Sequence, residues 1–117
     1  MSEHLIRSLD RLSRVRGVKG SMYVAAEDGL PVAQLLMEDV NGKALAAFAA
    51  SLARKVSGAS AATDSGRVKF IQMQAANGVL LICLGGDLLV AVIADAMVNV
   101  GLARLEMMRA AEAQGAA

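Results

Sequence analysis

The segment Lys43 to Ala62 reads KALAAFAASLARKVSGASAA and decides the fold prediction, because nine of its twenty residues are alanine. Alanine is the best helix former, so we expect a long helix that Asn41 caps and that runs to about Ser57. Its bulky stripe is Leu45, Phe48, Leu52 and Val56, and its small stripe is Ala46, Ala50, Ala53 and Ser57. We expect the bulky stripe to pack on the core, and the small side to admit another backbone, most simply a second copy of the chain.

Strand patterns lie on both sides of this helix. The expected strands are Val18 to Glu27, Leu30 to Met37, Arg67 to Ala76, Val79 to Leu84, and Asp87 or Leu88 to Ala94. Three dipeptides predict tight turns between neighbouring strands: Asp28-Gly29, of type I′, Asn77-Gly78 and Gly85-Gly86. Tight turns join antiparallel strands, so most of the sheet should be antiparallel.

The composition of each strand predicts its place in the sheet. VLLICL and LLVAVI are apolar at every position, so the last two strands should be central, with both faces covered. Pro31 cannot donate a ladder hydrogen bond, so its strand should lie or begin at an edge. Lys69, Gln72 and Gln74 interrupt the strand after the alanine-rich helix, which indicates an edge that meets solvent or a partner.

Helices are predicted at both ends of the chain. Leu5, Leu9 and Leu12 mark one face of a helix from His4 to Val15, which Ser2 could cap. Asp95 should cap a last helix from Ala96 to about Ala113, with a buried stripe of Val98, Leu102, Leu105 and Met108. Residues 58–66 read as a helix end and a mobile loop. The fold class is therefore α+β, one sheet with helices on both faces.

The length of 117 residues allows one domain, and its 56% apolar content suggests that part of the apolar surface is covered in an oligomer. The net charge of +1 gives no case for nucleic acid or membrane binding. Residues 1–20 are more basic, which indicates a solvated helix face with i,i+4 ion pairs or, less simply, an anion-binding patch. Neither a membrane span nor a signal peptide is evident, so we expect a soluble, cytoplasmic protein.

The sequence offers little for catalysis. It has one cysteine, Cys83, within an apolar run, and one histidine, His4, near the N-terminus. Cys83 fits a small buried hydrophobe better than a nucleophile. We find no phosphate-binding loop, dinucleotide motif or zinc ligand set, so we expect no enzyme, cofactor or metal site. The methionines fit core filling better than a promiscuous binding surface: Met73, Met97, Met107 and Met108.

The order of these elements and two short runs resemble the roadblock family, which includes dynein light chains of that name and bacterial gliding-polarity regulators. The first run is VKGSMYVAAEDGLPVAQL, from Val18 to Leu35, where the family has a strand, an acidic-Gly turn and a return strand. The second is Asn99 to Arg104, which resembles the family's N-x-G-x-A-R run. The resemblance covers residues 3–113.

The resemblance implies a single roadblock-like domain over residues 1–117. Its five-stranded antiparallel sheet would have the central helix on one face and the first and last helices on the other. Members pair as dimers through the central helix and the strand that follows it, here Arg67 to Gln74. With the small side of the helix, this predicts a dimer interface of Ala46, Ala47, Ala50, Ala53, Ser57, Val68, Phe70 and Gln72.

The resemblance also implies a function without catalytic residues or cofactors, as a regulator or platform for a small Ras-like GTPase. The candidate GTPase-binding residues are Lys43, Ser51, Arg54 and Lys55. The alternatives are a light chain or signalling scaffold without effect on GTP hydrolysis, and a small-molecule sensor. Gly101 should need a close neighbour, because glycine is costly in a helix, whereas Asn99 could bond to a loop or face solvent.

Overall fold

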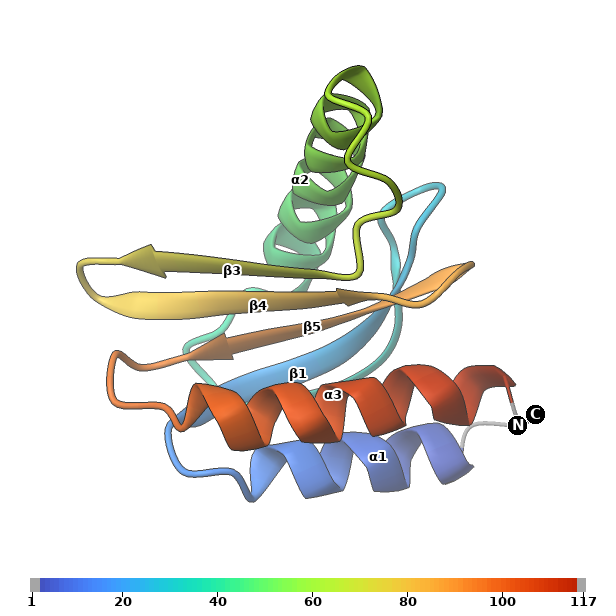
Figure 1. The fold of residues 1–117 in the computed structure, drawn as a ribbon. Coiled ribbons are helices and arrows are strands. Elements are labelled where there is room, and N and C mark those ends of the chain that lie inside the picture. The colour runs from blue at the N-terminus through green and yellow to red at the C-terminus, as the bar shows by residue number, and fades with distance from the viewer. Residues whose placement is uncertain (1–2, 116–117) are drawn as a thin grey trace.

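The computed structural model describes residues 3–115, which form three helices and one five-stranded sheet (Figure 1). The helices are α1 (Glu3–Ser13), α2 (Gly42–Ala62) and α3 (Val100–Gly115). The strands are β1 (Val18–Ala25), β2 (Pro31–Leu36), β3 (Phe70–Ala75), β4 (Gly78–Leu84) and β5 (Leu88–Ala94). The predicted fold class and element order are confirmed. The suggested cap Ser2 lies outside the described residues.

All strand pairs are antiparallel, and the strand order is β2-β1-β5-β4-β3. The two apolar strands β4 and β5 are central, and both β2 and β3 are edges, as the sequence predicts. Pro31 begins the edge strand β2, where its missing N–H costs no ladder bond.

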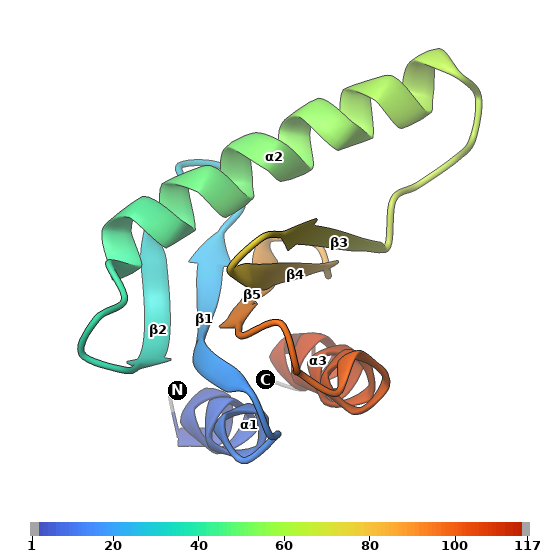
Figure 2. The same cartoon turned by 90° about the vertical axis from the view of Figure 1, so that its left-hand side faces the viewer.

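The sheet has a different helix layer on each face (Figure 2). α2 crosses one face, whereas α1 and α3 lie side by side on the other. Successive side chains of a strand point to opposite faces, so β4 alternates between the two cores: Leu81 packs with α1 and α3, and Leu80 and Ile82 pack with α2. The predicted α1 stripe of Leu5, Leu9 and Leu12 is buried, as expected.

Two predicted turns take other forms. Asp28 does not have the positive φ that a type I′ turn requires; only Gly29 does, at φ 72°, within a longer loop where Leu30 N–H donates to the Asp28 carboxylate. Gly78 does not sit at a turn centre but pairs with Ala75 in the ladder. A Cβ at Gly78 would lie 2.9 Å from the Ala94 carbonyl oxygen of β5, so glycine is required by a close strand approach.

Except at Leu45, which is buried in the core, the prediction of which side of α2 packs on the core was wrong. The side that faces the sheet is the small one, where Ala46, Ala50 and Ala53 are at most 4% exposed. Phe48, from the predicted buried stripe, is 47% exposed. Small side chains let the helix axis approach the sheet closely, and a bulky residue in their place would lift it away. α2 also continues past Ser57 to Ala62, so residues 58–62 are helical rather than loop.

In the predicted stripe of the last helix Val98 is buried as expected, but the other three residues are not. Leu102, Leu105 and Met108 are exposed, whereas Ala103, Met107 and Ala110 are buried against the sheet. These buried residues follow one another at helical spacing, so α3 also packs through a stripe that includes two alanines.

The start of α3 is set by Asn99 rather than by Asp95. Asn99 Oδ1 accepts the Leu102 N–H at 3.0 Å, whereas Asp95 accepts the Met97 N–H at 2.8 Å in a separate turn. Replacing Asn99 by alanine should therefore lower the free energy of unfolding by about 1 kcal/mol, the usual cost of a lost helix cap. Urea denaturation would measure this. An equal free energy for N99A and wild type would show that the cap contributes nothing.

Tyr23 connects the sheet to α3, since its buried hydroxyl donates to the Ala110 carbonyl at 2.7 Å. Y23F should destabilise the protein by about 1–3 kcal/mol, because that carbonyl loses its buried partner. Burial raises the pKa of Tyr23, and the Ser8 hydroxyl lowers it by less. The unfolded chain loses this proton near the ordinary pKa of 10.0. The stabilisation that the Tyr23 hydroxyl provides is therefore fully present below pH 10 and is lost as the pH rises further.

The matching measurement is urea denaturation of both proteins at neutral pH and at about pH 11. The difference in unfolding free energy between wild type and Y23F should become smaller at the higher pH, because only the wild type has this proton to lose. A gap that stays constant would contradict the account.

Candidate interaction surface

Strand β3 is the least covered strand of the sheet. One of its edges is free, α2 makes its main sheet contacts with β1, β2, β5 and β4, and α3 contacts β4 and β5. Figure 2 shows α2 rising away from the sheet as it passes β3. On the α2 side, Ile71 and Met73 are only half-buried, and between them Gln72 is exposed on the opposite face. A free, poorly covered edge is a template for pairing with another strand.

The bulky side of α2 and the inner face of β3 border the same core. Phe48, Leu52 and Val56 follow at four-residue intervals, so they share one side of the helix. Phe48 is exposed, and the other two are half-buried. Leu52 packs against the same core as Ile71 and Met73. We call these five residues the α2–β3 surface: Phe48, Leu52, Val56, Ile71 and Met73.

The predicted dimer residues fall into separate groups. Ala46, Ala50 and Ala53 are covered by the protein's own sheet, so their assignment to an uncovered helix face was wrong. Ala47 and Ser57 are exposed on α2, and Val68 is half-buried before β3. Phe70 and Gln72 lie on the other face of the sheet, where Phe70 carries the Arg104 guanidinium 5.1 Å from its ring centre.

Three of the four candidate GTPase-binding residues have no side-chain partner among residues 3–115. Lys43 and Lys55 are exposed on α2, and Ser51 is half-buried there. Arg54 instead donates to the Ala26 carbonyl at 3.3 Å, which ties α2 to the β1–β2 turn. Arg54 and Arg67 also line a groove of about 540 Å³ between α2 and residues 66–68.

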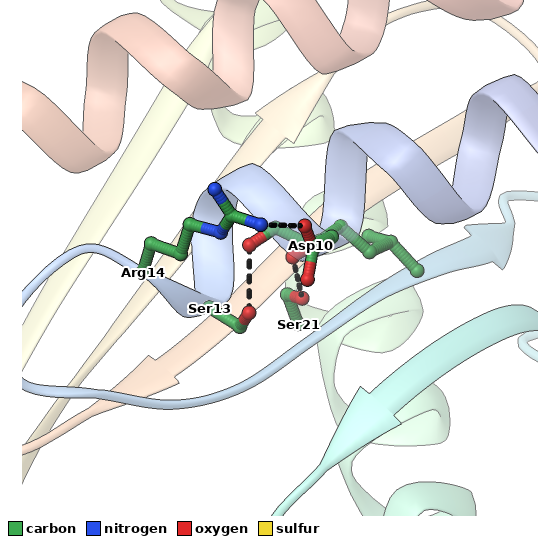
Figure 3. A network of polar contacts seen from close by, with 5 residues as sticks. Asp10, Ser13, Arg14 and Ser21 are labelled. Atoms are coloured by element: carbon green, nitrogen blue, oxygen red, sulfur yellow. Dashed lines mark hydrogen bonds and ion pairs between the residues drawn. The ribbon is translucent and has the colours of Figure 1, made fainter.

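The basic N-terminal region is a solvated helix face. Arg14 and Asp10 form an ion pair at 2.9 Å, and Ser13 donates to the Asp10 carbonyl at 2.7 Å (Figure 3). Arg7 and Glu3 form the other i,i+4 pair at 3.8 Å. These exposed pairs favour the solvated-face interpretation over an anion-binding patch.

Metal binding and the chemistry of Cys83 can be checked among the described residues. Residues 3–115 contain no cluster of His, Cys, Asp and Glu side chains that could hold a metal ion. Cys83 is buried, and burial raises the pKa of its thiol, an effect that the nearby Arg104 charge partly offsets. A thiol that is hard to ionise is a poor nucleophile, so the structure supports a packing role for Cys83.

The chain belongs to the Roadblock/LC7 domain family, whose model matches residues 7–94. It is 33% identical over 106 residues to the uncharacterized protein MJ1340 of Methanocaldococcus jannaschii, covering 91% of this chain and 92% of that protein. It is 34% identical over 113 residues to MJ0714 of the same organism, covering 96% and 95%.

Solved structures share the fold at low sequence identity. Myxococcus xanthus MglB superposes with a TM-score of 0.85 at 18% identity, covering 96% of this chain and 92% of that one. A Roadblock/LC7 domain from Streptomyces avermitilis superposes with a TM-score of 0.82 at 19% identity, covering 91% of this chain and 90% of that one. The gliding protein MglB of Thermus thermophilus also superposes with a TM-score of 0.82 at 19% identity, covering 95% of this chain and 85% of that one.

Proposed function

We propose that this protein is a homodimeric, non-catalytic regulator or platform for a small Ras-like GTPase. The observation that carries the proposal is the α2–β3 surface, where a free strand edge adjoins five incompletely buried apolar side chains. Its membership of the Roadblock/LC7 family and its likeness to gliding MglB proteins support the same function. No helix among residues 3–115 has the length and apolar character needed to cross a membrane.

The dimer forms when the β3 edges of two copies pair and the bulky sides of their α2 helices meet above the joined sheet. β3 can donate and accept the new ladder bonds because its outer edge is unpaired. Phe48 and Leu52 then become covered, together with Met73. This contact replaces the one predicted through the small side of the helix, and it retains the predicted strand.

The GTPase is bound across the outer side of the paired α2 helices. Ser51 and Lys55 are four residues apart on one row of α2, facing away from the sheet. Lys43 adds a second positive charge near the start of the helix. These charges would attract acidic side chains of the GTPase and speed its association.

The test measures binding of this protein to each small GTPase of the same genome, in both nucleotide states, together with the rate of GTP hydrolysis. We expect one GTPase to bind, with K55E weakening binding at least threefold while the distant control R16E leaves it unchanged. Binding without a change in hydrolysis would identify a scaffold. Failure of every GTPase to bind would refute the proposal.

A further inference from the structure

Helix α3 exposes its large apolar side chains on the face of the protein opposite α2. Leu105 and Met108 are each 47% exposed, and Leu102 is 44% exposed, although the helix is anchored by buried Ala103 and Ala110. These exposed residues take no part in the α2–β3 surface, because α3 lies on the other side of the sheet (Figure 2). They form a second apolar region that another chain could cover.

Charges of opposite sign flank Met108 along one row of the helix, and the three residues of this row line a pocket together with Lys69 and Phe70. Arg104, Met108 and Glu112 follow at four-residue intervals and therefore lie above one another. Arg104 makes no ion pair within residues 3–115 and stacks over Phe70. The Glu112 carboxylate has no ion-pair or hydrogen-bond partner in the same described part of the chain. The row thus begins with an unpaired positive charge and ends with an unpaired negative one.

This row is complementary to an antiparallel copy of itself. A twofold axis through Met108 places Arg104 beside Glu112 of the second copy, and the symmetry repeats the pair at the other end. The same axis places Gly101 opposite Gly115 of the second copy. Gly101 is exposed, and a Cβ there would meet only Asn99 Oδ1, at 3.7 Å, so the neighbour expected for this glycine is not among the described residues of its own chain.

We propose that α3 is a second self-association surface, on which two copies of the protein meet antiparallel along the row Arg104, Met108 and Glu112. The 16-residue helix is only about 24 Å long, so the contact is smaller than a standard interface and should be weak. Together with the α2–β3 contact, it gives each chain two different twofold contacts, which link dimers into larger assemblies as concentration rises.

Sedimentation velocity over a range of protein concentrations tests the contact through charge reversal. R104E and E112R should each weaken the association by about tenfold, because each creates two symmetry-related like-charge pairs. The double variant R104E/E112R should recover most of it, since the pairs are restored with their signs exchanged. R11E, on exposed α1, is the matched control and should have no effect.

The α3 contact is also measured apart from the α2–β3 contact and from GTPase binding. In an F48E background, which removes the α2–β3 contact, the chain should still form a dimer at high concentration, and L105E should abolish it. A double charge variant that associates no better than either single variant would overturn the proposed pairing. A folded F48E chain that stays monomeric at every concentration would overturn the α3 surface itself.

Discussion

Replacing Ala50 by glutamate should unfold the protein, whereas the same replacement at Ala47 should be tolerated. Ala50 is 1% exposed between α2 and the sheet, and Ala47 is exposed on the same helix. A carboxylate at position 50 would be larger than the space available, and its charge would be buried without a partner. We expect A50E to lose about 4 kcal/mol or more of unfolding free energy, and A47E to lose less than about 0.5 kcal/mol.

Urea denaturation followed by circular dichroism measures both free energies at equal protein concentration. The comparison of A50E with A47E tests the orientation of α2, because the sequence pattern predicts that Ala50 lies on an uncovered face. A stable, folded monomer of A50E would support that arrangement and contradict the packing described above.

Replacing Phe48 by glutamate should separate the proposed dimer into folded monomers. Phe48 is the most exposed member of the α2–β3 surface, so a monomer loses little when it becomes polar. The dimer, in contrast, would bury two carboxylates where it had two aromatic rings. Buried aromatic anchors typically contribute about 2 kcal/mol or more to an interface, so the dimer dissociation constant should rise at least about 30-fold.

Light scattering coupled to size exclusion gives the mass of each species. The matched control is A47E, which adds the same charge at a neighbouring exposed residue on another row of the helix. A dimer of unchanged affinity in F48E would show that this side of α2 is not the interface.

The sequence predicts the sheet well because its signals are local. The apolar runs of β4 and β5 require cover on both faces, and Pro31 and Gln72 mark the two edge strands. The sequence predicted Gly78 at a turn, but the reason for this glycine is not local. A side chain at Gly78 would collide with the Ala94 carbonyl of β5, and the residues around Gly78 do not indicate that β5 lies so close.

The faces of α2 and α3 could not be read from side-chain size alone. Both helices carry small residues on one side and bulky residues on the other, and either side can pack on a sheet. Ala53 in α2 and Ala103 in α3 are buried because they permit a close approach. Phe48 and Leu105 remain exposed on the other side of their helices. A single sequence does not record which apolar side of a helix packs within the chain.

The central claim is that the dimer formed through the α2–β3 surface is the unit that binds a GTPase. Its most direct test is the dissociation constant of the GTPase for wild type and for two dimer-breaking variants, F48E on α2 and M73E on β3. The account predicts that both variants, verified as folded monomers, bind at least about tenfold more weakly. Monomers that bind the GTPase as tightly as wild type would contradict it.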